Sequence, residues 1–165
     1  MTEQTRKNVE AAFIGEAKAH FRLLAFAGRA EEEGYPQVAR LFRAVAAAES
    51  VHAKSHFELL ERVQTTEENL KFSFEKETFV NRVAYPAFLK QASADEDKKA
   101  FWYFTKARNT EEGHAHLYKL AISDMVSDKD TKYFVCSYCG WVETLMRPEQ
   151  CSNCERGPEF YSEIQ

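Results

Sequence analysis

Glutamate and histidine occur three residues apart at two places in the sequence, and this spacing suits metal binding. The two pairs are Glu49–His52 and Glu111–His114, and the second pair lies 62 residues after the first. Residues three apart in an α-helix lie about 60° apart around the axis, so both side chains of a pair can reach one point beside the helix. Carboxylates and imidazoles are ligands that suit iron or manganese. Each pair therefore indicates part of a metal site.

A single glutamate precedes each pair at nearly the same distance. Glu16 lies 33 residues before Glu49, and Glu77 lies 34 residues before Glu111. The four glutamates and two histidines together form the ligand set of ferritin-like di-iron or di-manganese bundles. One Glu-x-x-His pair alone is usually a solvated or hydrogen-bonded pair, but its repetition with a partner glutamate favours metal. Two divalent ions would neutralise the four carboxylates, which are otherwise costly to bury.

Four helices are needed to position these ligands, and the sequence predicts them between residues 5 and 127. Apolar residues recur there at spacings of three and four, and each apolar stripe is interrupted at mid-length by a carboxylate. Gly34-Tyr35-Pro36 separates the first helix from the second, and Ser93-Ala94-Asp95 separates the third from the fourth. Thr65 and Thr66 offer N-caps for the third helix. The repeated spacing of the ligands indicates two helical hairpins of one design.

Four other residues lie where they could support the ligands, and a fifth histidine does not. His20 and His56 each lie one turn from a candidate ligand, which predicts hydrogen bonds to the ligand shell. His116 points away from the apolar stripe and is expected on the surface. Tyr85 and Tyr118 could hydrogen-bond ligand carboxylates or serve as ordinary core aromatics.

All four cysteines lie in two CxxC pairs after the helical pattern ends. The pairs are Cys136–Cys139 and Cys151–Cys154, separated by eleven residues. Four thiolates at this spacing predict a tetrahedral site for iron or zinc, and ligand chemistry alone does not separate the two metals. A redox-active disulfide is the alternative, although both pairs lie outside any βαβ pattern. Gly140, after the first pair, allows a tight turn around the metal.

These patterns predict a mainly α fold in two parts. A four-helix bundle spans residues 1–130, a linker covers residues 128–132, and a four-cysteine metal domain spans residues 131–165.

The net charge is −4 with both signs interspersed, so no basic tract indicates nucleic acid. No apolar stretch approaches the roughly 20 residues of a membrane span, and the start contains no signal-peptide core. We therefore expect a cytoplasmic protein.

With these motifs the sequence resembles the rubrerythrin family, which joins a ferritin-like di-iron bundle to a rubredoxin-like module. The resemblance covers essentially the whole chain. The motifs that carry it are Ala12-Phe13-Ile14-Gly15-Glu16, Glu49-x-x-His52-Ala53-Lys54, Glu77 followed by Tyr85-Pro86, Glu111-x-x-His114 and the two CxxC pairs.

The resemblance implies a peroxidase that reduces hydrogen peroxide to water and protects against oxidative stress. It implies two iron ions in the bundle, bridged by Glu49 and Glu111, and one iron ion in the four-cysteine site, with zinc or manganese as substitutes. Electrons would enter from an NAD(P)H-linked rubredoxin reductase or a rubredoxin and pass through the cysteine-bound iron. The implied ligands are Glu16, Glu49, His52, Glu77, Glu111, His114, Cys136, Cys139, Cys151 and Cys154.

One departure from the family pattern bears on activity. Rubrerythrins usually carry another glutamate one turn after the third-helix ligand, and here that position is Val80. A tyrosine common in the first helix is also replaced, by Leu23. The remaining four-glutamate, two-histidine site is closer to that of bacterioferritins and favours a ferroxidase or iron-handling alternative, whereas the cysteine module favours the peroxidase. A zinc-bound structural scaffold is a third alternative.

The short connection between the two hairpins predicts how the protein assembles. The second helix, of about 24 residues, would be about 36 Å long at ~1.5 Å per residue. Residues 62–66 reach at most ~18 Å, too short to return along the bundle to a parallel third helix. Two alternatives follow: a monomeric up-down-up-down bundle, or a homodimer with exchanged helical hairpins. The internal repeat and the family resemblance favour exchange.

Overall fold

The structure, a computed structural model, describes residues 1–124 and 131–165. It is mainly helical and ends in a small sheet that carries the cysteines, which confirms the predicted fold class. Contacts within the chain divide it into two compact units, Met1–Gln64 and Thr65–Gln165. The predicted helix end at residue 127, linker residues 128–130 and the domain boundary at residue 130 lie outside the described residues, so the two-domain division stays a prediction. None of the described helices is long and apolar enough to cross a membrane.

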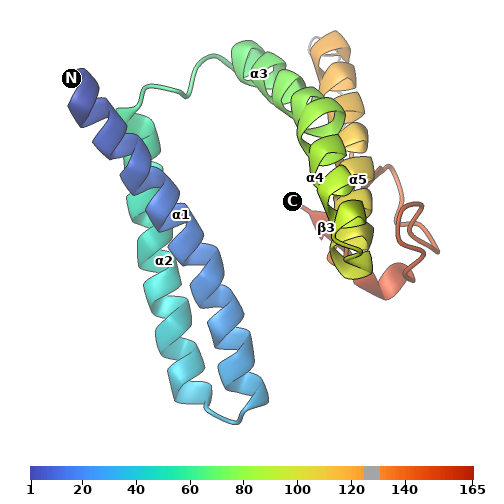
Figure 1. The fold of residues 1–165 in the computed structure, drawn as a ribbon, viewed down its shortest axis with the longest axis horizontal. Coiled ribbons are helices and arrows are strands. Elements are labelled where there is room, and N and C mark those ends of the chain that lie inside the picture. Colours follow the sequence, from blue (N-terminus) through green and yellow to red (C-terminus); the bar gives the residue numbers. More distant parts are fainter. Residues whose placement is uncertain (125–130) are drawn as a thin grey trace. The chain divides into compact units, whose positions relative to one another are not determined.

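The first unit is a hairpin of two antiparallel helices, α1 (Glu3–Glu32) and α2 (Pro36–Leu59), shown in blue and cyan in Figure 1. The Thr2 side chain caps α1 by accepting a hydrogen bond from the backbone N–H three residues on. Gly34 has a φ of +80°, a left-handed conformation that glycine adopts without strain. The predicted break at Gly34-Tyr35-Pro36 is therefore confirmed.

Alanine dominates the buried positions between α1 and α2. The buried apolar residues of this unit are Ala19, Ala27, Ala30, Ala39, Ala46, Ala53 and Leu60. Alanine lets helices approach closely but removes little apolar surface from water. Larger side chains stay exposed, among them Phe21 at 71% and Leu41 at 61%. The hairpin therefore buries only a small part of its apolar surface by itself.

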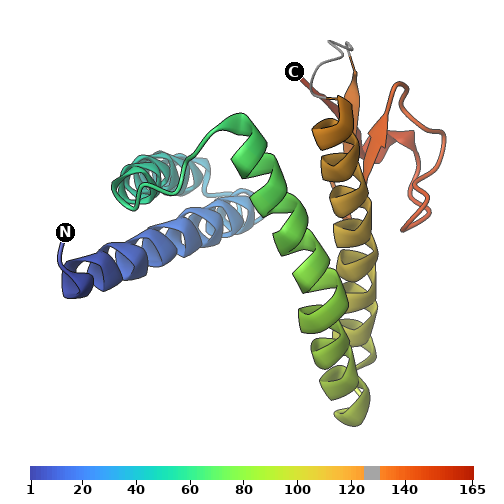
Figure 2. The same ribbon diagram turned by 90° about the horizontal axis from the view of Figure 1, so that it is seen from above.

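In the second unit, α3 (Thr66–Phe79), η1 (Val80–Ala84) and α4 (Tyr85–Ala94) form one continuous helical rod beside α5 (Lys98–Asp124), as Figures 1 and 2 show. Thr65 and Glu68 form a reciprocal capping box at the start of α3. The predicted N-cap at Thr65 is confirmed.

The segment η1 is π-helical and was not predicted from the sequence. Asn81 is buried, and its Nδ2 donates to the Arg108 carbonyl at 2.8 Å. Arg108 Nε donates in return to the Asn81 carbonyl at 3.1 Å. This reciprocal pair fixes the π-helical turn to α5. Such turns are frequent at functional sites, and η1 begins three residues after Glu77.

The cysteine module, by which we mean residues 131–165, contains a three-stranded antiparallel sheet. β1 (Tyr133–Cys136) is central, between β2 (Val142–Thr144) and β3 (Tyr161–Ile164). A 3₁₀ turn, η2 (Pro158–Phe160), leads into β3. The buried core residues are Phe134, Cys136, Cys151 and Tyr161. Two of these are cysteines, so much of this small core surrounds a possible metal site.

Candidate metal centres

The first unit brings together three of the predicted ligands. Glu16 on α1 and Glu49 and His52 on α2 each place one ligand atom within 4.8 Å of the other two. His52 Nδ1 lies 3.1 Å from Glu49 Oε2, which is the contact expected for residues three apart on a helix. Two carboxylates and one imidazole therefore converge on one point, a donor set that fits iron or manganese.

The second unit repeats this arrangement. Glu77 on α3 and Glu111 and His114 on α5 also place their ligand atoms within 4.8 Å of one another. His114 Nδ1 lies 3.1 Å from Glu111 Oε2, the same distance as in the first unit. The six predicted bundle ligands therefore form two half-sites of identical composition, one in each unit. Their combination into one di-metal site stays a prediction.

One carboxyl group of the second half-site, that of Glu77, resists ionisation. Burial, together with the hydrogen bond and the charge of Glu111, raises the pKa of Glu77 to about 7. Burial and the charges of the same two carboxylates raise the pKa of Tyr85, which also packs against Phe88 and Phe104. A bound cation would favour the ionised carboxylates and oppose the increase in the Glu77 pKa. The half-site is therefore better suited to a cation than to bare carboxylates.

The four cysteines form the third cluster. Cys136 Sγ lies 3.8 Å from Cys154 Sγ, and Cys139 Sγ lies 3.7 Å from Cys151 Sγ. Both distances are far longer than the bond of a disulfide, about 2.05 Å. Four sulfurs that surround a zinc ion tetrahedrally at about 2.3 Å would lie about 3.8 Å apart. The cysteines therefore have the spacing of a tetrahedral metal site, and the disulfide alternative receives no support.

Both CxxC pairs adopt the same tight backbone turn. The Gly140 N–H donates to the Cys136 carbonyl, and the Glu155 N–H donates to the Cys151 carbonyl, both at 2.9 Å. The φ angle is +79° at Gly140 and +63° at Glu155. Glycine adopts this left-handed conformation freely, whereas glutamate does so at some cost. The predicted turn at Gly140 is confirmed, and the second pair makes the same turn without a glycine.

A polar network attaches the cysteine module to α5. Asn153 lies between the two cysteines of the second pair and is buried. Its amide nitrogen donates to the Lys106 carbonyl at 2.9 Å and to Thr110 Oγ1 at 3.0 Å. Its amide oxygen accepts from Asn109 Nδ2 at 3.2 Å, and Lys106 Nζ donates to its backbone carbonyl. Thr110 donates in turn to the Cys139 carbonyl at 3.0 Å. The loop around the cysteines is therefore fixed to α5 at several points.

The same interface reaches a predicted metal ligand. His114 Nε2 lies 3.3 Å from the Gly140 carbonyl, to which its N–H can donate. This hydrogen bond leaves Nδ1, on the carboxylate side, available to bind a metal. A Cβ atom on Gly113 would lie 3.0 Å from the Trp141 ring, so glycine permits the close packing beside His114. A candidate bundle ligand thus contacts the residue that follows Cys139.

Sequence reasoning did not identify Asn153, Thr110 or Gly113 as important to the site. Thr110 directly precedes Glu111, and Asn153 directly precedes Cys154. The available sequence signal was therefore that Thr110 and Asn153 each stand next to a predicted ligand. A polar residue beside a ligand is common, however, so this signal could not show that the two side chains meet.

The three remaining histidines contribute no candidate ligand. His20 Nδ1 hydrogen-bonds to the Ala46 carbonyl at 2.8 Å, so it joins α1 to α2 instead of supporting a ligand as predicted. His56 Nδ1 is buried without a hydrogen-bond partner in the described structure. His116 is exposed, as predicted.

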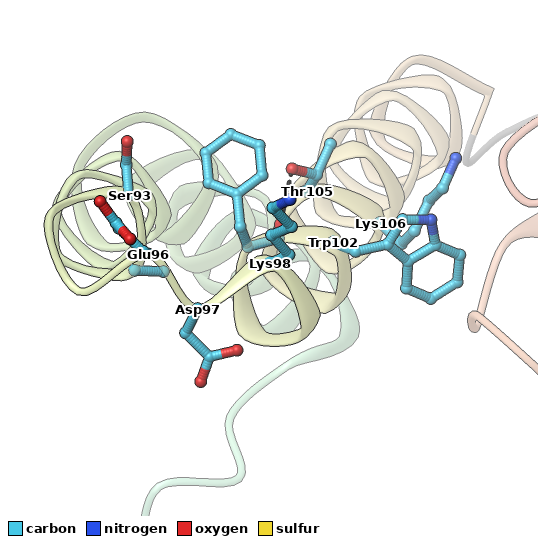
Figure 3. Close-up of a pocket in the computed structure, with 9 residues that line it drawn as sticks. Ser93, Glu96, Asp97, Lys98, Trp102, Thr105 and Lys106 are labelled. Atoms are coloured by element: carbon cyan, nitrogen blue, oxygen red, sulfur yellow. Dashed lines mark hydrogen bonds between the residues drawn. The ribbon is translucent and has the colours of Figure 1, made fainter.

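A groove of about 620 Å³ lies between the end of α4 and the start of α5. Figure 3 shows Ser93, Glu96 and Asp97 at the hairpin turn, with Trp102 and Lys106 farther along α5. None of the ten candidate ligands lines this groove. The groove is therefore separate from the three candidate metal clusters.

Comparisons with known proteins extend over both the helices and the cysteine module. The family model described as Rubrerythrin matches residues 7–122. Nigerythrin of Nitratidesulfovibrio vulgaris is 33% identical over 96% of this chain and 85% of that protein. Rubrerythrin-2 of Clostridium acetobutylicum is 31% identical over 88% of this chain and 89% of that protein. A solved structure of nigerythrin in a partially reduced state is 31% identical, with a TM-score of 0.61, over 99% of this chain and 88% of that chain.

Proposed function

Because the chain belongs to the rubrerythrin family, we propose that it is a non-haem di-iron peroxidase that reduces hydrogen peroxide to water. Each peroxide consumes two electrons and two protons and yields two water molecules. Bound iron supplies the change in oxidation state that cleavage of the O–O bond requires. The proposed ligands of two bundle irons are Glu16, Glu49, His52, Glu77, Glu111 and His114, and those of a third iron are Cys136, Cys139, Cys151 and Cys154.

The hydrogen bond between His114 and the Gly140 carbonyl is the observation that supports this proposal most directly. It connects a proposed ligand of the bundle site to the residue next to Cys139, a proposed ligand of the other site. Thr110 and Asn153 hold the cysteine module in this position. A relay that returns electrons is needed for repeated turnover of peroxide, whereas a ferroxidase that releases its product does not need one. The contact therefore favours the peroxidase.

The proposed electron donor is an NAD(P)H-linked rubredoxin reductase or a rubredoxin. The cytoplasm is the proposed location, because four-cysteine metal sites are typical of reducing compartments, where disulfides are rare. By the family resemblance, Glu49 and Glu111 are the proposed bridging ligands, and zinc or manganese are proposed substitutes for iron.

The proposal is tested with iron-reconstituted protein, NADH and a rubredoxin reductase. Peroxide-dependent oxidation of NADH is expected in the native chain. Cys139→Ser should abolish this turnover, while peroxide should still oxidise the chemically reduced bundle site once. Ser137→Ala, in the same CxxC loop, is the matched control and should retain turnover. A chain that holds three irons but consumes no peroxide would reject the proposal.

Val80 favours a second candidate, a ferroxidase or iron-handling protein with weak peroxidase activity. Val80 begins η1, one turn after Glu77, where the family pattern has a further glutamate. We expect Val80→Glu to raise the rate with peroxide relative to the rate with oxygen. Val83→Glu, at an exposed position of the same π-helical segment, is the control. An unchanged or lower ratio in Val80→Glu would show that Val80 does not set the reactivity.

We further propose that the protein is a homodimer in which helical hairpins are exchanged. Residues 60–65, which connect α2 to α3, span about 20 Å when fully extended. The 24-residue helix α2 is about 36 Å long. In a ferritin-like bundle the connection must return along this length, because the third helix runs parallel to the second. Exchange avoids the return by combining the first unit of one protomer with the second unit of its partner.

The exposed apolar residues of the first unit support this assembly. Most of the buried residues between α1 and α2 are alanines, whereas Phe21, Leu41 and Val51 are more than half exposed. Such residues favour a further packing partner. The candidate cluster of each unit holds two glutamates and one histidine, so pairing a first unit with a second unit, within one chain or by exchange, would assemble the full predicted ligand set.

A further inference from the structure

The carboxylate of Glu143 is a charged group of the cysteine module that the proposed reaction does not use. Glu143 on β2 is half-buried, whereas the other four glutamates of the module are exposed. Its Oε1 atom accepts two hydrogen bonds, from Trp141 Nε1 at 2.8 Å and from Ser152 Oγ at 2.9 Å. Among the ion pairs of the described residues, the module contributes only that of Lys132 with Glu163. Glu143 therefore carries a negative charge that no described cation balances at contact distance.

The two hydrogen-bond donors place this carboxylate between the loops that carry the cysteines. Ser152 directly follows Cys151, and Trp141 lies two residues after Cys139. Because the hydrogen bond from Ser152 is 2.9 Å long and Ser152 adjoins Cys151, the carboxylate oxygen lies at most about 12 Å from the Cys151 sulfur. One oxygen atom thus contacts a residue beside each CxxC pair.

The sheet offers a second glutamate for comparison. Glu143 on β2 and Glu163 on β3 both pair with Phe134, on opposite sides of the central strand β1. Glu163 is exposed, and its Oε1 atom lies 3.1 Å from Lys132 Nζ. Water and the lysine both weaken the field of that carboxylate, whereas a half-buried charge without a cation is screened less. Glu143 is therefore the carboxylate of the module with the stronger effect on a nearby charged centre.

We propose that Glu143 sets the reduction potential of the cysteine-bound iron, because it holds a negative charge between the two cysteine loops that lowers this potential. The inference rests on the proposed iron occupancy of the cysteine site. An electron that arrives from the proposed donor reduces ferric to ferrous iron and adds one negative charge to the centre. The fixed charge of Glu143 opposes this addition, so the electron is held less strongly. Glu143 thereby favours onward transfer of the electron to the ferric bundle site.

The test compares Glu143→Gln with Glu163→Gln in the iron-reconstituted full chain. Glutamine has nearly the shape of glutamate and keeps an oxygen that can accept both hydrogen bonds, so Glu143→Gln removes mainly the charge. It should raise the reduction potential in a redox titration, with iron content and circular dichroism as in the native chain. Glu163→Gln removes an equal charge from an exposed, ion-paired position and should change the potential much less. Ser152→Ala removes one hydrogen bond but retains the charge, so its potential should stay near that of the native chain.

Iron content distinguishes the possible outcomes. Normal iron content with an unchanged potential in Glu143→Gln would overturn the inference and leave the proposed iron relay intact. Equal increases in Glu143→Gln and either Glu163→Gln or Ser152→Ala would also overturn it, because the charge at position 143 would then not be the cause. A native chain whose cysteines bind no iron would overturn both the inference and the relay.

A further variant covers the case in which Glu143→Gln does not fold. Ser152→Lys, at an exposed position, places a cation beside the native carboxylate and should raise the potential relative to Ser152→Ala. Equal potentials in these two variants would overturn the inference.

Discussion

The two half-sites have the same ligands but different surroundings. Both place a histidine Nδ1 3.1 Å from a glutamate oxygen. The His52 side chain is 57% exposed, whereas that of His114 is 27% exposed and also reaches the Gly140 carbonyl. The first half-site lies on a hairpin closed by alanine, and the second is supported by a π-helical segment and the cysteine module. Duplication of the ligands therefore does not imply duplication of the role.

The substitutions with the largest expected effect test whether each bundle metal site is shared between two chains or built within one chain. Glu49→Ala and Glu111→Ala should each abolish the bundle metals and peroxide turnover, while the cysteine site stays filled. If hairpins are exchanged, a heterodimer of the two variants contains one intact and one doubly damaged site. Mixing the unfolded variants and refolding them together should therefore restore partial activity.

This complementation needs proof that heterodimers form. Differently tagged chains, purified through both tags, provide it, and refolded mixtures of two Glu49→Ala preparations provide the inactive control. Purified heterodimers without activity would rule out exchange and favour sites built within single chains.

The next largest effect concerns the support that only the second half-site receives in the described structure. Asn153→Ala removes hydrogen bonds to Lys106, Asn109 and Thr110, so docking of the module should weaken by about 1–3 kcal/mol. A loss of about 1.4 kcal/mol reduces the equilibrium constant for docking about tenfold. NADH-dependent peroxide turnover should fall accordingly.

Stopped-flow measurement of the bundle-site reduction checks this prediction, with elemental analysis to show that all metals remain. Ser152→Ala is the matched control, because the Ser152 hydroxyl bonds to Glu143 within the module. Equal rates in Asn153→Ala and Ser152→Ala would show that the Asn153 network does not control electron transfer.

A smaller effect compares glycines in the two units. Gly28 in α1 is exposed with open space around its Cβ position, so Gly28→Ala should stabilise the protein by about 0.5–1 kcal/mol. Gly113→Ala gains the same helix propensity but forces Trp141 to move. Thermal unfolding should show stabilisation for Gly28→Ala and none for Gly113→Ala. Trp141 fluorescence should change only in Gly113→Ala, and equal stabilisation of both variants would contradict the observed packing.

The smallest effect tests the start of the second unit. Thr65→Ala removes the capping box of α3 and should cost about 1 kcal/mol, whereas Thr65→Ser should retain most of it. The hydrogen bonds from Thr65 lower the pKa of Glu68 below its ordinary value of 4.5. Because the folded-state pKa is depressed, this stabilisation is present above pH 4.5 and is lost as the pH falls through the folded pKa.

Urea unfolding between about pH 3 and pH 7 measures this dependence. The difference in stability between the native chain and Thr65→Ala should shrink at the acid end. A difference that stays constant with pH would show that the carboxylate of Glu68 contributes nothing to the cap.

Sequence reasoning succeeded where a structural feature depends on residues close together in the chain. The N-cap at Thr65, the turn at Gly34 and the turn at Gly140 are local, and each was predicted. It failed where the partner is distant: His20 bonds to Ala46, and Asn81 bonds to Arg108 to hold an unpredicted π-helical turn. Distant partners depend on how helices pack, and no periodic pattern encodes that packing.

The sequence by itself determined which ligands this protein can offer. A spacing of three residues in a helix brings Glu111 beside His114, and CxxC spacing suits a turn around a metal, because both geometries follow from local backbone structure. Only the tertiary structure decided that His114 meets Gly140, 26 residues away, and that the Thr110 hydroxyl donates to the Cys139 carbonyl. These contacts depend on packing between elements, which shape and polarity select across the folded chain.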